Sequence, residues 1–218
     1  MTNPHVKESA GVGTTCPSLL HRIKAMEPAA WERFVVLYGP LVYQWCRRSG
    51  LQEADAADVG QDVFRAVFRT VATFRHDRPS DSFRGWLWTI TRRKIIDVAR
   101  RRDASPGDGV GGSEMLTLVQ SLPDEDTDPT ASDPLVGRGL FGRAVELILG
   151  ECREEIRQAF LRVVVDGQRP DVVAESLGLK VNVVYLAKSR ILKRMREEFA
   201  GLLPAELLSA SAPRLRTT

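Results

Sequence analysis

The sequence predicts an all-α protein made of two helical domains that are joined by a flexible acidic linker. Apolar residues recur at helical spacing on both sides of residues 103–134. The stretch between them is rich in proline and glycine, and such a composition does not build a packed core. Between Asp103 and Gly137 it carries eight acidic residues and no basic one. Two separate helical blocks therefore flank an acidic spacer.

The first block is expected to span residues 17–102, after a disordered leader formed by residues 1–16. A short helix is expected over residues 17–26 and a second one over residues 28–48, ended by Gly50. The second helix carries an apolar stripe that we interpret as core: Trp31, Phe34, Val35, Tyr38, Leu41, Val42 and Trp45.

Two more helices complete this block. The third is expected over residues 55–74, where valines four residues apart form the buried face (Val59, Val63, Val67, Val71) and charged residues form another (Asp58, Asp62, Arg65, Arg69). A turn at residues 76–81 precedes the fourth helix, which Asp81 or Ser82 caps and which runs to Arg102.

The second block is expected to span residues 135–203, before a fraying tail at residues 204–218. Its helices are predicted over residues 139–149, 153–165, 170–177 and 181–200. The last two, with Gly178 between them, form a helix-turn-helix. Between Lys180 and Arg196 there are six basic residues and no acidic one, as expected of a helix that lies against phosphates.

The outer face of the last helix is the first candidate DNA interface. An α-helix fits the major groove of B-DNA, and its N-terminal residues reach base edges. Arg190 would bond guanine, whereas Lys180, Lys193, Arg194 and Arg196 are better placed for phosphates. The face as a whole consists of Lys180, Asn182, Tyr185, Leu186, Ser189, Arg190 and Lys193. The competing interpretation is a helical hairpin that packs on another protein.

The fourth helix is the second candidate. Between Arg84 and Arg102 it holds seven basic residues and one acid, Asp97. Trp86 and Trp88 point to different sides, so at most one of them is fully buried. An aromatic ring beside guanidinium groups can stack on unpaired bases. The competing interpretation is that both tryptophans belong to the core.

Other classes of function are disfavoured. The three cysteines (Cys16, Cys46, Cys152) are far apart, which argues against a disulfide framework or a zinc site. The three histidines (His5, His21, His76) have no partner at metal or triad spacing, so no metal, cofactor or enzymatic activity is expected. No segment has the apolar length of a membrane span or a secretory signal, and we expect a cytoplasmic protein.

Residues 18–200 resemble bacterial RNA polymerase sigma factors of the sigma-70 family. The runs from Asp55 to Phe64 and from Phe83 to Arg102 are similar to the second region of the family, and residues 139–199 to its fourth region. The order of these segments and the linker length point to the extracytoplasmic-function (ECF) group.

The resemblance implies three interfaces and their partners. One helix would dock on the clamp helices of the polymerase largest subunit through Asp58, Gln61, Asp62 and Arg65. The aromatic-basic helix would bind and open the minus-ten element through Trp86, Trp88, Thr89, Arg92, Arg93, Lys94, Arg100 and Arg101. The last helix would read the minus-thirty-five element in promoter DNA. Members are often held by an anti-sigma protein.

The sequence departs from the family at two places. Arg93 stands where members commonly have asparagine, and an arginine accepts no hydrogen bonds. Tyr185 and Leu186 stand where members often have a basic residue followed by serine. The base preferences of relatives therefore do not transfer to this chain.

Three alternatives remain at this point. A helix-turn-helix regulator that is not a polymerase subunit would bind DNA as a dimer, at a palindromic site. A nuclease or other enzyme would need a catalytic constellation that the residues do not suggest. A helical adaptor would not need two separated basic helices.

Overall fold

The computed structural model describes residues 17–75, 82–103, 133–204 and 208. All regular elements in these ranges are helices, and none of those helices has the length and apolarity to span a membrane. The leader, the turn at residues 76–81, most of the linker and most of the tail lie outside the described residues, as do Cys16, His5 and His76. The all-α prediction is confirmed.

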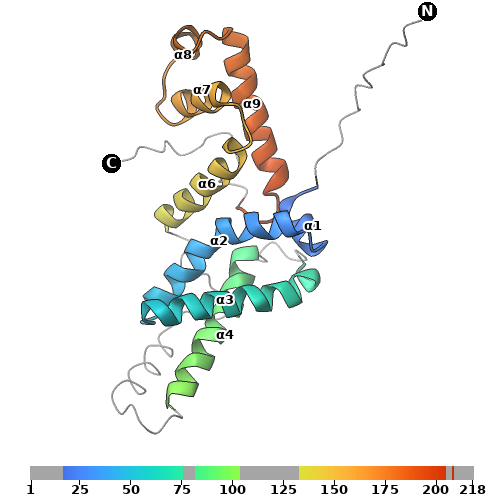
Figure 1. Cartoon of the computed structure of the whole chain (residues 1–218), viewed down its shortest axis with the longest axis vertical. Helices are drawn as coiled ribbons and strands as arrows, with labels where there is room; N and C mark the ends of the chain where they lie inside the picture. Colours follow the sequence, from blue (N-terminus) through green and yellow to red (C-terminus); the bar gives the residue numbers. More distant parts are fainter. Residues whose placement is uncertain (1–16, 76–81, 104–132, 205–207, 209–218) are drawn as a thin grey trace, which may run out of the picture.

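The helices follow the predicted order. The first block contains α1 (Leu19–Lys24), α2 (Pro28–Arg48), α3 (Glu53–Thr70), the 3-10 turn η1 (Val71–Thr73) and α4 (Phe83–Asp103). The second contains α6 (Pro134–Leu149), α7 (Glu154–Val164), α8 (Pro170–Ser176) and α9 (Val181–Glu198). Figure 1 shows α1–α4 in the lower half of the molecule and α6–α9 in the upper half.

Capping side chains explain where two helices begin. The Oγ atom of Ser82 accepts a hydrogen bond from the Gly85 amide at 2.9 Å, so Ser82 starts α4. The Asp133 carboxylate accepts one from the Leu135 amide at 2.9 Å, and Pro134 occupies the first turn of α6. Helix α6 therefore begins five residues before its predicted start at residue 139, and Asp133 and Pro134 belong to it rather than to the linker.

Aromatic side chains fill the core of the first block. Helix α2 packs against α3 and α4, and the Trp45 and Trp88 rings meet edge to face with centroids 5.4 Å apart. The Phe83 ring lies against Phe34 and Phe74. The interpretation of Val35 as core is wrong, because its side chain is 42% exposed while that of Phe34 is fully buried. Val35 points about 100° away from Phe34 around the helix, and this direction leads out of the core.

The two blocks pack on each other. Helix α6 contacts both α2 and α9, and one apolar cluster runs without a break from Leu19 to Leu203. The Tyr38 hydroxyl donates to the Leu202 carbonyl oxygen, and Nε of Arg143 donates to the Leu37 carbonyl oxygen at 2.8 Å. The two predicted domains are therefore in direct contact and do not pack separately.

Four charged side chains form ion pairs at this contact. Arg33 of α2 is ion-paired with both Glu151 and Glu198, and Arg194 of α9 is ion-paired with the same two carboxylates. Burial opposes ionisation of Glu151, but Arg194 and Arg33 outweigh it and hold the pKa of Glu151 below its usual value. We call these four residues the Arg33 cluster.

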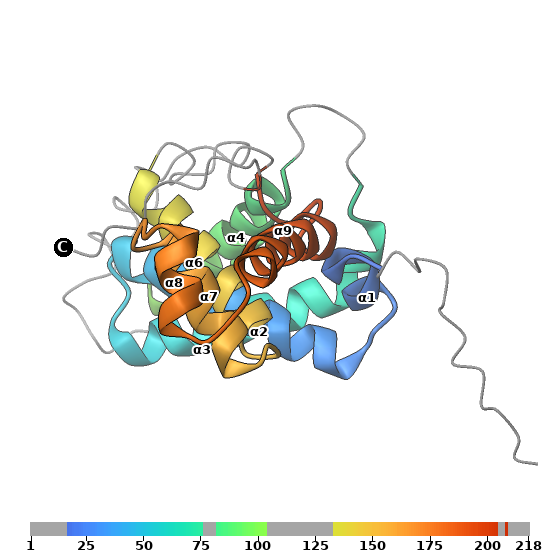
Figure 2. The same cartoon turned by 90° about the horizontal axis from the view of Figure 1, so that it is seen from above.

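Helices α7, α8 and α9 form a compact unit. Both α7 and α8 pack on α9, as the view from above also shows (Figure 2). A second small core joins Ala159, Val173, Ala174 and Val184 from the three helices. Gly178 makes the turn between α8 and α9. Its φ of +64° lies in the left-handed region, which glycine adopts without strain. The predicted helix-turn-helix is present.

Candidate functional site

The outer face of α9 is exposed to solvent. The seven residues predicted on this face are exposed: Lys180, Asn182, Tyr185, Leu186, Ser189, Arg190 and Lys193. Arg196 is also exposed, but the assignment of Arg194 to phosphates is wrong, because its half-buried side chain is ion-paired with Glu151 and Glu198. The opposite face buries Val184, Ala187 and Ile191 at helical spacing, and this contact fixes the orientation of the helix. The structure therefore brings the predicted residues together on one surface.

On α4 the two tryptophans lie on different sides, as predicted. Trp86 is half-buried, with its ring centroid 5.1 Å from that of Phe74 and 5.3 Å from that of Phe83. Trp88 is 1% exposed. Its inclusion among the minus-ten residues was wrong, because a ring packed against Trp45 inside the core cannot reach a base.

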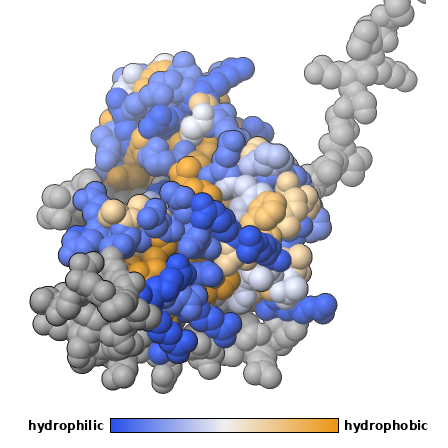
Figure 3. All heavy atoms as spheres, turned by 60° about the horizontal axis from the view of Figure 1, so that its bottom comes forward, coloured by the Kyte–Doolittle hydropathy of each residue, from blue (hydrophilic) through white to orange (hydrophobic). Residues whose placement is uncertain are grey.

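The predicted DNA-binding residues of α4 other than the tryptophans differ in how far they are exposed. Arg93, Arg100 and Arg101 are exposed, whereas Thr89, Arg92 and Lys94 are half-buried. The Thr89 hydroxyl donates to the Gly85 carbonyl oxygen at 3.2 Å, and Lys94 lies 3.9 Å from the Asp97 carboxylate. Figure 3 turns the lower end of the molecule toward the viewer. The surface seen there is largely hydrophilic, with apolar areas between the polar ones. Arg93 is the most accessible cation in the middle of the helix.

The predicted polar face of α3 exists as a hydrogen-bonded group. Asp58, Gln61 and Arg65 are exposed, and Asp62 is half-buried. Arg65 donates to the Asp62 carboxylate at 2.6 Å and to the Gln61 side-chain oxygen at 3.2 Å. These contacts hold the Arg65 guanidinium along the helix.

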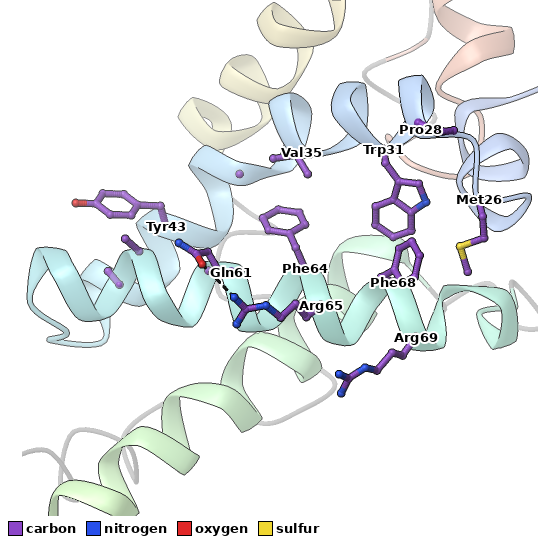
Figure 4. Close-up of a pocket in the computed structure, with 14 residues that line it drawn as sticks. Met26, Pro28, Trp31, Val35, Tyr43, Gln61, Phe64, Arg65, Phe68 and Arg69 are labelled. Atoms are coloured by element: carbon purple, nitrogen blue, oxygen red, sulfur yellow. Dashed lines mark hydrogen bonds between the residues drawn. The ribbon is translucent and has the colours of Figure 1, made fainter.

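An apolar groove, which the sequence analysis missed, lies beside this group. It runs between α2 and α3, has a volume of about 1140 Å³ and is lined by Trp31, Val35, Tyr43, Gln61, Phe64 and Phe68 among others. Figure 4 shows the Trp31 ring of α2 close to the Phe68 ring of α3, and their centroids, 5.1 Å apart, place the two rings in contact within it. We call it the α2/α3 groove. The signal in the sequence was a second stripe at steps of four residues along α2, formed by Trp31, Val35, Gly39 and Tyr43.

The described residues hold no group of three or more His, Cys, Asp or Glu side chains that could bind a metal. Cys46 is buried, and desolvation raises the pKa of its thiol to about 12. A thiol in that environment is a packing group and a poor nucleophile at neutral pH.

Comparisons with known proteins assign the first block. Residues 34–105 match the family described as Sigma-70 region 2, and this range covers most of α2 and all of α3 and α4. The chain is 25% identical to the ECF RNA polymerase sigma factor SigE of Mycolicibacterium smegmatis over 174 residues. It is 29% identical to the RNA polymerase sigma factor CnrH of Cupriavidus metallidurans over 177 residues. Residues 34–105 therefore form a sigma-70 region 2 domain, and most of the chain is similar to RNA polymerase sigma factors.

The extent of these matches differs between relatives. The SigE match covers 78% of this chain and 62% of SigE, and the CnrH match covers 81% of this chain and 88% of CnrH. A solved structure of CnrH in complex with the cytosolic domain of CnrY is 22% identical, with a TM-score of 0.32, and the match covers 88% of this chain and 96% of the CnrH chain.

Proposed function

We propose that this chain is an RNA polymerase sigma factor of the ECF group, which directs the polymerase to promoters and helps to open the DNA there, as an initiation factor rather than an enzyme. The observation that carries the proposal is the separation of three exposed surfaces on one chain. Helices α4 and α9 each bury an apolar face and expose cations, and the α2/α3 groove offers a third surface that is apolar. Two nucleic-acid surfaces and one protein surface are what a promoter-recognition subunit requires.

The α2/α3 groove and the adjoining polar face would together receive the polymerase. Amphipathic helices bind in apolar grooves through residues at helical spacing. A clamp helix of the largest subunit that lay along the groove would cover Val35 and Phe68 and meet Asp58, Gln61 and Arg65 at its edge. The sequence-based docking residues are then the polar rim of a larger interface, whose apolar centre supplies most of the binding energy.

The exposed side of α4 would hold the minus-ten element. Unpaired bases stack on aromatic rings, and Trp86 is half-buried whereas Phe83 and Trp88 of the same helix are buried. Arg93, Arg100 and Arg101 would neutralise phosphates of the opened strand. Stacking and charge neutralisation would offset the free energy needed to unpair the bases.

The exposed side of α9 would lie in the major groove of the minus-thirty-five element. Each DNA contact alone would be weak because it buries little surface, and the polymerase scaffold would raise the effective concentration of the second contact once the first has formed. We also propose that a protein antagonist holds the chain, since its relative CnrH was solved in complex with the cytosolic domain of CnrY.

The test uses two neighbouring valines of α2. Val35 lines the α2/α3 groove, whereas Val36 is 52% exposed and does not line it. We expect Val35→Glu to weaken the affinity for core polymerase at least tenfold, about 1.4 kcal/mol, because it places a charge in an apolar interface. Val36→Glu is the matched control and should bind as the wild type does.

Thermal unfolding of both variants verifies that they remain folded. If the wild-type chain binds specific DNA but not core polymerase, the chain is a helix-turn-helix regulator and the proposed function is wrong. Equal polymerase binding by both variants would exclude the α2/α3 groove as the docking surface.

A further inference from the structure

The N-terminal half of α9 exposes apolar side chains. The side chain of Tyr185 is 57% exposed, that of Leu186 42% and that of Val181 41%. The core needs none of them, because Val184, Ala187 and Ile191 already cover the buried side of the helix and are at most 5% exposed. Leu186 also lines the edge of a cavity of about 340 Å³ between α6, α7 and α9. Exposed apolar residues that adjoin one another mark a binding surface.

Cations surround these residues. Lys188, Arg190 and Lys193 are exposed on the same helix and Lys180 immediately precedes it, while the first acidic residue of α9 is Glu197. Lys193 is ion-paired with Glu197 at 3.7 Å, about two helical turns beyond Leu186. An occupant of this surface therefore has to be anionic around its edge and apolar at its centre.

The major groove of B-DNA has both properties. Phosphates line its two sides, and thymine presents a C5-methyl group on its floor. A protein partner would have to supply acidic side chains around an apolar knob, whereas any thymine-containing duplex presents this combination without adaptation. Nucleic acid is the occupant that the charge pattern favours.

Resting on the promoter function proposed above, we propose that Leu186 and Tyr185 read thymine methyl groups in the minus-thirty-five element. Asn182 lies one helical turn before Leu186, is exposed, and carries the carboxamide that pairs with adenine N6 and N7. The three side chains together select A·T pairs at the centre of the element. Lys188, Arg190 and Lys193 then contact phosphates or a guanine at its edge.

The experiment begins with selection from duplexes that carry a randomised minus-thirty-five element, using the full chain bound to core polymerase. Each thymine of the selected element is then replaced by deoxyuridine, which lacks only the C5-methyl group. Burying one methyl group contributes about 0.8 kcal/mol, so each contacted thymine should lose roughly fourfold in affinity.

Two variants identify which side chain makes each thymine methyl contact. In Leu186→Ala, the replacement of one thymine by deoxyuridine should no longer change the affinity, and the same holds for Tyr185→Ala at a second thymine. Val172→Ala is the matched control. Val172 is an apolar residue of α8 in the same unit, 52% exposed, and its removal should leave every deoxyuridine effect intact.

The outcomes separate this inference from the proposed function. Selected elements without thymine, or deoxyuridine effects that are absent or that persist in both variants, overturn the methyl contacts while promoter recognition stands. Failure to select any sequence in the presence of polymerase overturns the proposed function itself.

Discussion

Two tryptophans of α4 that are two residues apart have different roles. The Trp88 ring lies in the core against Trp45, so Trp88→Ala should leave a large cavity and lower the free energy of unfolding by about 3–5 kcal/mol. Urea denaturation followed by circular dichroism measures this loss. Arg93→Ala is the control on the exposed side, and it should change stability by less than about 0.5 kcal/mol while reducing open-complex formation. Similar stability losses for both would contradict the assignment.

The buried thiol of Cys46 makes a pH-dependent contribution. Its pKa is raised from 9.0 to about 12, so above pH 9 the unfolded chain loses this proton while the folded chain keeps it. The stabilising effect is complete below pH 9 and is lost as the pH rises toward 12, by up to about 1.4 kcal/mol per pH unit.

Denaturation at pH 8 and at pH 10.5 measures the slope. The Cys46→Ala variant lacks this thiol, so its stability should fall less between the two pH values than that of the wild type. Identical slopes for the two proteins would show that the thiol is not buried as described.

At the scale of single elements, the pattern of apolar residues determined how well the sequence predicted each face. Helix α9 has one apolar side, and all seven residues predicted on its outer face are exposed. Helix α2 has apolar residues on two sides, and periodicity alone assigned Val35 to the core. The second apolar side is the α2/α3 groove, and nothing in the spacing distinguishes a residue that a partner covers from one that the core covers.

The turn of the helix-turn-helix allows a clean test of backbone conformation. At Gly178 (φ +64°) an added Cβ would meet no atom within 4 Å, so Gly178→Ala should cost about 1–2 kcal/mol from the left-handed backbone alone. Gly142, within α6, is equally uncrowded, and no left-handed φ applies to it.

Gly142→Ala is therefore the matched control and should stabilise the protein by up to about 1 kcal/mol. Thermal unfolding of the two variants gives both values. A stabilised Gly178→Ala variant would mean that the turn adopts another conformation in solution.

At the scale of the whole molecule, the contact between the two blocks limits what the chain can reach. The minus-ten and minus-thirty-five elements are about 25 base pairs apart, or roughly 85 Å at 3.4 Å per base pair. A compact chain of 218 residues has a diameter of only about 45 Å. If α4 and α9 bind these two elements as proposed, the two blocks would have to separate first.

A fluorescence energy-transfer measurement checks this separation. Donor and acceptor dyes at Gln52 and Gln168, two exposed residues in different blocks, should report a short distance in the free chain and a longer one with core polymerase. Arg33→Ala removes the ion pairs that join α2 to Glu151 and Glu198, while Arg194 still neutralises both carboxylates, so it should lengthen the distance in the free chain. An unchanged distance on polymerase binding would contradict the opening.

The sequence could not predict this contact between blocks. It depends on pairs that are more than a hundred residues apart, such as Arg33 with Glu198 and Arg143 with Leu37. Helical periodicity is a local property and carries no information on which helices meet. The helices and the helix-turn-helix follow from local pattern, whereas the Arg33 cluster follows only from the tertiary arrangement.

The most direct test of the central claim is transcription in vitro by core polymerase on a library of promoter sequences, with and without the purified chain. The account predicts that the chain produces new transcripts that start at a fixed distance from two selected DNA elements, and that Val36→Glu retains this activity while Val35→Glu loses it. Transcripts that do not depend on the chain, or no transcript from any member of the library, would contradict the account.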